Sequence, residues 1–139
     1  MNKDMHSNIK VVHAITPAAV GTTGIAGGKL SAILDRKQAG VYYRSAEFIF
    51  NSGTSATVAD TITPVIYEAA ATGDSFTSVA DADLLGAETA LTLTAAKSGN
   101  IGYRGNKRYL KIRLFGVGTA TAVVAASLIL GNPDIAPTS

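Results

Sequence analysis

The nine residues KRYLKIRLF, Lys107–Phe115, combine the spacing of a β-strand with an unusual density of positive charge. Successive side chains of a strand point to opposite faces of its sheet, so residues two apart share a face. One face of this segment holds Arg108, Leu110, Ile112 and Leu114. The other face holds Lys107, Tyr109, Lys111, Arg113 and Phe115. The segment therefore predicts a strand with an apolar core face and a cationic, aromatic outer face.

Further strand patterns flank this segment, spaced roughly ten residues apart and separated by turns rich in Gly, Ser, Thr, Asp and Asn. In Val41–Phe50, the face with Tyr42 also holds Ala46, Phe48 and Phe50, and the face with Tyr43 holds Ser45, Glu47 and Asn51. The other predicted strands are Ile9–Thr16, Thr61–Ala69, Thr89–Ala95 and Thr121–Leu130. Pro64 lacks a backbone N–H, so we expect its strand at a sheet edge or a bulge.

Helical signals are few. Ser78–Glu88 predicts one short turn, with Asp81 as its N-cap and Gly86 as its stop. Lys29–Gln38 has the spacing of a short helix and the length of an early strand, and the sequence leaves both open. The glycines of Gly21–Gly28 indicate a loop or an arm.

These patterns predict an all-β fold, a jelly roll or antiparallel β-sandwich with a flexible N-terminal arm. The 139 residues fit one domain, because domains most often have about 100–150 residues. We therefore expect residues 1–139 to form a single domain, with flexible ends at 1–8 and 132–139.

Composition restricts the partners. Twelve basic and ten acidic residues give a net charge of +2, too close to balance for a dedicated nucleic-acid binder. Only 16% of the residues are charged, against the usual ~25%, so we expect a partner or a second copy to cover part of the surface. No apolar run approaches the ~20 residues of a membrane span, and the start of the chain is polar. The expectation is a soluble, unexported protein without a membrane or nucleic-acid partner.

The glycine-rich segment GTTGIAGGKLS, Gly21–Ser31, resembles a phosphate-binding loop only superficially. The Walker pattern requires Gly, four residues, then Gly-Lys-Ser/Thr. With Gly28 and Lys29 aligned to that pattern, Thr23 occupies the first glycine position and Leu30 the hydroxyl position. A flexible arm is the better interpretation.

Other catalytic patterns are also missing from the sequence. The two histidines, His6 and His13, do not have the i, i+4 spacing of a helical zinc site. Asp81 and Asp83, near Asp74, lack the further ligands of a calcium loop, and capping of loops is the better interpretation. There is no cysteine and no G-x-S-x-G elbow. We therefore expect a protein that is not an enzyme and binds no cofactor or metal.

The C-terminal part of the chain, Gly102–Pro133, resembles the C-terminal hairpin of small virion proteins of tailed bacteriophages. A Gly-Tyr-x-Gly-x-Lys-Arg-Tyr stretch leads into a strand, and a Gly-Thr-rich turn, an Ala/Val-rich strand and a Leu-Gly-x-Pro ending follow. The segments IKVVHAITP, SAEFIFNSGT and DSFTSVADADLLGAE are similar to parts of the same proteins. The likeness spans most of the chain and is to the capsid cement proteins, which decorate and stabilise phage heads.

This resemblance implies a jelly-roll domain on the outer surface of an icosahedral capsid, assembled in the host cytoplasm. There it would bind the major capsid protein, as a symmetric homodimer that bridges capsomers. The candidate partner-binding residues are Tyr103, Arg104, Lys107, Tyr109, Lys111 and Arg113. The alternative is a carbohydrate- or host-binding β-sandwich module of a phage tail or fibre. The lack of Trp argues mildly against it, because sugar sites usually stack an aromatic ring on the ligand.

Overall fold

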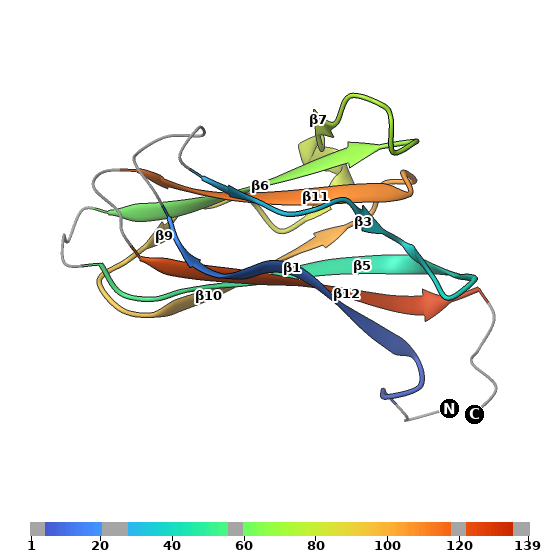
Figure 1. Cartoon of the computed structure of the whole chain (residues 1–139), viewed down its shortest axis with the longest axis horizontal. Coiled ribbons are helices and arrows are strands. Elements are labelled where there is room, and N and C mark those ends of the chain that lie inside the picture. The colour runs from blue at the N-terminus through green and yellow to red at the C-terminus, as the bar shows by residue number, and fades with distance from the viewer. Residues whose placement is uncertain (1–4, 21–27, 56–59, 118–121, 135–139) are drawn as a thin grey trace.

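Two antiparallel β-sheets stack face to face in the computed structural model, which describes residues 5–20, 28–55, 60–117 and 122–134 (Figure 1). These residues contain no α-helix, and the predicted all-β class is confirmed. The first sheet has the order β1 (Ile9–Ala19), β12 (Val123–Pro133), β5 (Val41–Ser52), β10 (Lys97–Tyr103) and β8 (Leu84–Leu85), with β4 (Lys37–Gln38) paired to β5. The second has the order β2 (Lys29–Leu30), β11 (Tyr109–Val117), β6 (Thr61–Ala69) and β7 (Thr77–Ser78), with β3 (Leu34–Asp35) paired to β11 and β9 (Leu91–Thr92) to β6.

From β5 onward, long strands that follow one another in the chain mostly alternate between the two sheets. The chain passes from β5 in the first sheet to β6 in the second, and from β10 through β11 back to β12. Strands that pair within a sheet are therefore mostly distant from each other in the sequence, as in a jelly roll. The predicted sandwich of this type is confirmed.

The core lies between the sheets and is formed by alternate residues of the long strands. Leu110, Ile112 and Leu114 have no exposed surface, as the alternation in β11 predicted. They pack with Phe48 and Leu128 of the first sheet in one apolar cluster. Burial of such side chains contributes about 1.5–3 kcal/mol each, which makes this cluster the main source of stability.

Some predicted positions differ from the structure. Arg108 was placed on the core face, but it precedes β11 and is partly exposed beside Asp35. In β5, Tyr43 is buried together with Ala46, Phe48 and Phe50, whereas the prediction placed Tyr42 on their face. The reason is that two successive residues, Arg44 and Ser45, are both exposed, which shifts the alternation by one residue.

The extent of several strands also differs from the prediction. The pattern at Thr89–Ala95 forms only the two-residue β9, and Lys29–Gln38 forms three two-residue strands and no helix. The strand β10 was not predicted, because its two glycines and Asn100 are typical of turns. Gly99 in β10 is required there: a Cβ would lie 2.5 Å from the Phe50 ring, so a side chain would displace a core residue.

The short turn predicted at Ser78–Glu88 is a 3₁₀-helix at Asp81–Asp83. Asp81 is not its N-cap; that position is Ala80, and no side chain caps the helix. Gly86 is not its stop either: the C-cap is Leu84, and Gly86, with a φ of +100°, follows β8.

Pro64 lies at an outer edge, as predicted. Its strand β6 pairs with β9 at Thr61 and Ile62 and with β7 at Tyr67 and Glu68, so Pro64 falls between these short partners. The Ile66 N–H points away from β11, toward Glu88, and residues two apart in a strand have the same orientation. The missing N–H of Pro64 therefore removes no bond to β11.

The expected flexible ends lie partly outside the described residues, as do residues 21–27 of the predicted loop or arm at Gly21–Gly28. Of the described part, Asn132 and Pro133 belong to β12, and the Asp134 N–H donates to the Tyr42 carbonyl at 2.9 Å. Within the described residues, no helix is long and apolar enough to cross a membrane.

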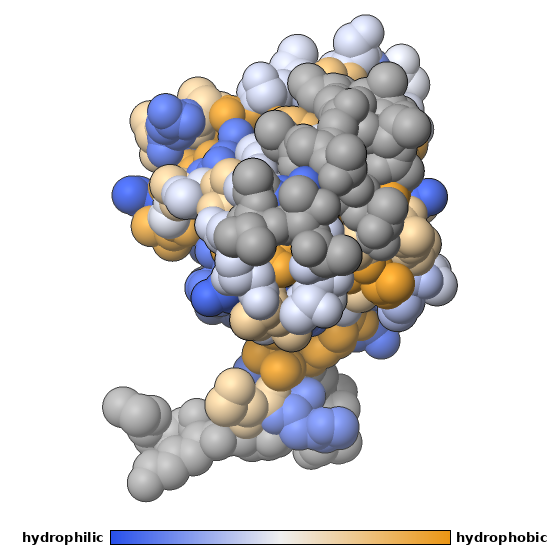
Figure 2. All heavy atoms as spheres, turned by 90° about the vertical axis from the view of Figure 1, so that its left-hand side faces the viewer, coloured by the Kyte–Doolittle hydropathy of each residue, from blue (hydrophilic) through white to orange (hydrophobic). Residues whose placement is uncertain are grey.

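Large apolar side chains also reach the surface. At the end of the sandwich drawn in Figure 2, apolar residues are scattered among polar ones. The exposed large hydrophobic residues are Met5, Val11, Leu30, Ile33, Leu85 and Val123. Scattered apolar residues of this kind are ordinary for a folded domain, so a docking surface must be argued from the local chemistry.

Candidate functional site

The outer face of the second sheet carries the cationic strand that the sequence singled out. Tyr109, Lys111 and Arg113 of β11 are half-buried there. Lys111 lies opposite Tyr67 of β6, and Arg113 lies opposite Leu30 of β2. We call these five residues the β11 face. The alternation therefore separated this face correctly from the buried Leu110, Ile112 and Leu114.

Aromatic rings support the cations on or beside this face. The Lys111 Nζ lies 4.2 Å from the centre of the Phe76 ring, and the Arg113 Cζ lies 6.0 Å from that of Tyr67. Each such contact contributes about 0.5–1 kcal/mol at exposed sites. The rings therefore hold the long side chains across the sheet and reduce the entropy that they would lose in binding a partner.

The centre of the β11 face is hollowed. Leu30, Tyr67, Lys111 and Arg113 line a depression of about 180 Å³ together with Phe76, which precedes β7. Leu30, on the wall of this depression, is 42% exposed. An apolar wall beside two cations suits a protein surface that presents a carboxylate next to an apolar side chain.

An ion pair closes one end of the face. The Arg108 guanidinium donates to both carboxylate oxygens of Asp35, at 2.8 and 2.7 Å, and its Cζ lies 4.9 Å from the centre of the Tyr109 ring. The hydrogen bond from Arg108 lowers the pKa of Asp35 below its usual value. Asp35 therefore neutralises Arg108 at neutral pH.

Tyr103 and Arg104 do not belong to the β11 face. Tyr103 is only 3% exposed, so it is a core residue and not a surface contact. Its hydroxyl donates to Glu68 and accepts from the Lys107 N–H at 2.9 Å. Arg104 is exposed, but it lines a hollow on the first sheet. Of the four remaining candidates, Tyr109, Lys111 and Arg113 lie in β11, and Lys107 lies two residues before it.

The segment before β11 is held by Arg36, which the sequence analysis did not single out. This arginine is only 2% exposed. Its Nη1 donates to the carbonyls of Gly105 and Lys107 at 3.1 and 3.0 Å, and its Nη2 donates to the carbonyl of Arg44. The guanidinium thereby ties β5 of the first sheet to the segment that enters the second.

Two tyrosine rings enclose the same guanidinium. The Arg36 Cζ lies 5.1 Å from the centre of the Tyr42 ring and 5.3 Å from that of Tyr103. The carbonyl acceptors and ring faces account for both terminal nitrogens of Arg36, whereas its buried Nε has no hydrogen-bond partner in the part of the chain that the structure describes. No spacing in the sequence marks Arg36, because its partners come from two separate segments, Tyr42–Arg44 and Tyr103–Lys107.

The other motifs considered in the sequence serve local structure. Asp74 accepts a hydrogen bond from the Ala71 N–H at 3.0 Å, which is turn capping as expected. Lys29 lies in β2, whereas a phosphate-binding lysine would stand at the start of a helix. Among the described residues, no three His, Asp or Glu side chains are grouped so that they could hold a metal ion.

Comparisons of the chain with protein-family models, with curated proteins and with solved structures found no match. The fold is therefore defined by the structure alone, and the function is inferred from the surface chemistry and from the sequence resemblance described above.

Proposed function

We propose that this protein is a capsid cement protein of a tailed bacteriophage. It would bind the outside of the icosahedral shell and stabilise contacts between subunits of the major capsid protein. The observation that carries the proposal is the β11 face, which joins cations, tyrosines and an exposed leucine on three neighbouring strands of one sheet. The resemblance of Gly102–Pro133 to phage cement proteins covers this same strand.

The chemistry of the face favours an acidic protein surface. Tyrosine and arginine are enriched at the centres of protein interfaces, where each buries a large area. Lys107, Lys111 and Arg113 supply positive charge that would attract and orient carboxylates. Leu30 and Tyr67 add apolar area at the centre of the contact.

Stabilisation of the shell follows from mass action. A protein that binds the assembled shell, and not its separated subunits, shifts the equilibrium toward the assembled form. The sandwich acts as a rigid block between neighbouring subunits, and a symmetric homodimer would bridge two capsomers. This role needs neither catalysis nor a cofactor.

The test is co-sedimentation of the purified protein with empty shells assembled from the major capsid protein of the phage whose genome encodes it. We expect the protein to pellet with shells and to remain soluble without them. Shells that carry the protein should also withstand heating better than bare shells. A protein that stays in the supernatant at saturating shell concentration would show that the proposal is wrong.

A further inference from the structure

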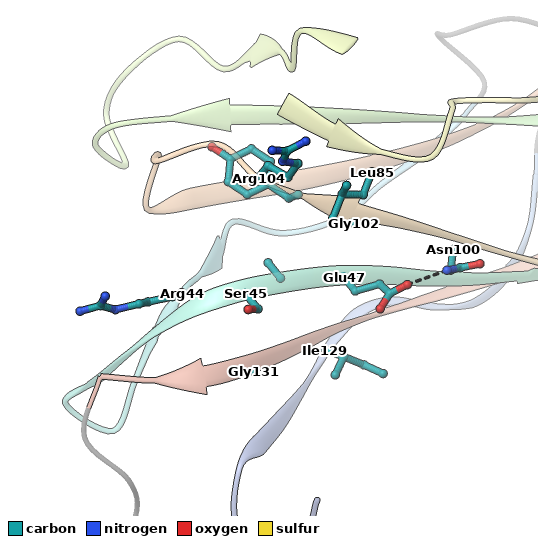
Figure 3. A pocket seen from close by; sticks show the side chains of 11 residues that line it. Arg44, Ser45, Glu47, Leu85, Asn100, Gly102, Arg104, Ile129 and Gly131 are labelled. Carbon is teal, nitrogen blue, oxygen red and sulfur yellow. Dashed lines mark hydrogen bonds between the residues drawn. The ribbon is translucent and has the colours of Figure 1, made fainter. Parts of the chain in front are cut away.

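A second hollow lies on the other sheet, away from the β11 face. Its volume is about 590 Å³, and it lies across β5, β10 and β12 of the first sheet (Figure 3). The register across these strands joins Ile129 to Glu47 and Glu47 to Gly102. We call this hollow the β5–β10 trough.

The trough exists because small residues occupy its floor. Gly131 of β12 lies opposite Ser45 of β5, and Gly102 follows on β10. A Cβ on Gly131 would have its nearest neighbour, the Ser45 Cβ, at 3.8 Å, so the space above it is open. Larger side chains, including Leu85 and Ile129, rise around this floor.

Oriented polar groups line the trough. The Asn100 Nδ2 donates to the Glu47 Oε1 at 2.6 Å, and Figure 3 shows the two side chains pointing toward each other from neighbouring strands. This bond fixes both planar groups and leaves the second carboxylate oxygen and the amide oxygen as further acceptors. Ser45 adds a hydroxyl that both donates and accepts.

The trough and its rim carry two positive and two negative side chains, so their charges cancel. Arg44 pairs with Asp134 and points away from Glu47 (Figure 3), which leaves Arg104 to balance Glu47. A phosphate-rich ligand would meet the Glu47 carboxylate, so the trough does not favour a polyanion. An extended peptide is also disfavoured, because β5 is already paired along its length with β12 and β10 and offers no backbone groups.

A neutral ligand with many hydroxyls fits these constraints. Its hydroxyls would bond to Glu47, Asn100 and Ser45. Its C–H groups would pack on Leu85, which is 56% exposed and takes the place of the aromatic ring that sugar sites usually supply. We propose that the β5–β10 trough binds a short neutral saccharide. The site is independent of the proposed cement function, and it lies on the sheet opposite the β11 face, so both surfaces can be occupied together (Figure 1).

The test is an amide NMR titration of the full chain with the methyl glycosides of glucose, galactose, mannose and N-acetylglucosamine, after a screen on a glycan array. We expect at least one neutral sugar to shift the amide signals of Asn100, Gly102 and Gly131 at millimolar concentration. Sulfated polysaccharide serves as the polyanion probe and should not compete.

Two valine variants locate the site. Gly131→Val fills the trough where no strained φ requires glycine, and we expect it to weaken sugar binding at least about tenfold. Ser127→Val on the same strand lies outside the trough lining and should bind as the wild type does. Both variants should still sediment with shells, so failure of the sugar site and failure of the cement function are distinguishable. The proposal is overturned if no neutral sugar binds, if the shifts map to the β11 face, or if Gly131→Val binds normally.

Discussion

The Tyr103 hydroxyl donates a hydrogen bond to the Glu68 carboxylate and so joins the two sheets. Tyr103 ends β10 of the first sheet, and Glu68 lies in β6 of the second. The same hydroxyl accepts the Lys107 N–H, two residues before β11 begins. Burial, and then the bond to Glu68, raise the pKa of the Tyr103 phenol well above its usual 10.0.

Tyr103→Phe should therefore destabilise the protein by about 1–3 kcal/mol, because Glu68 loses a donor and Lys107 an acceptor. The pH dependence is a second readout. Above pH 10 the unfolded chain loses the phenol proton while the folded state keeps it, so wild-type stability falls as pH rises. The variant should lack this contribution in urea unfolding measured from pH 7 to 11. Equal stability and equal slopes for both proteins would contradict the assignment.

Arg36→Met should cost at least about 3 kcal/mol, because three backbone carbonyls lose a charged donor inside the sandwich. Arg104→Met is the matched control: that arginine is exposed, so its replacement should change stability by less than about 0.5 kcal/mol. Urea unfolding followed by circular dichroism measures both. A small loss at Arg36, similar to that at Arg104, would show that the buried arginine is dispensable.

Glu88→Gln should raise stability at neutral pH. The Glu88 Oε1 accepts the Ile66 N–H at 2.6 Å, and partial burial raises the pKa of this carboxyl above 4.5. As pH rises above 4.5, the unfolded chain ionises before the folded state does, so this residue lowers stability from there up to its folded pKa. Gln keeps an oxygen acceptor and never ionises, so its Tm should exceed the wild-type Tm at pH 7.

Glu88→Ala separates the hydrogen bond from the charge. This variant leaves the Ile66 N–H without its acceptor and should cost about 1–3 kcal/mol. The expected order of Tm at pH 7 is Gln, then Glu, then Ala. A wild type more stable at pH 7 than Glu88→Gln would mean that the charged bond outweighs the cost of burying the carboxylate.

Lys107→Glu combined with Lys111→Glu should weaken binding to shells by about tenfold or more at low salt, because the new carboxylates on the β11 face and just before it would repel an acidic partner. The loss should shrink at high salt, where exposed charges are screened. Thermal unfolding should change little, since exposed charges contribute little stability. Unchanged sedimentation of this variant would remove the β11 face from the proposed interface.

Ile112→Asp tests the opposite face of the same strand. Ile112 has no exposed surface, so aspartate would bury an unpaired charge at the centre of the core. We expect the far-ultraviolet circular dichroism of a folded sheet to be lost at 25 °C. A folded Ile112→Asp protein would contradict the assignment of inner and outer faces in β11.

The class of fold follows from local patterns that the sequence contains in full. A strand needs only an alternation of period two, so β6 was predicted with its observed ends and the core face of β11 with its three buried residues. The cations beside Tyr109 were also visible, because they lie within a few residues of one another. The Tyr42–Tyr43 assignment was wrong, because two successive exposed residues interrupt the period.

The remaining features depend on residues that are distant in the chain. Arg36 bonds to carbonyls 69 and 71 residues away, so no local spacing distinguishes it from a surface arginine. Tyr103 looked like part of the cationic surface, and only its partner 35 residues earlier makes it a core residue. The trough likewise requires Ser45, Gly102 and Gly131 to meet across three strands. Such positions are decided by how the sheets pair and stack, because burial and hydrogen bonding are properties of the assembled sandwich and not of any one segment.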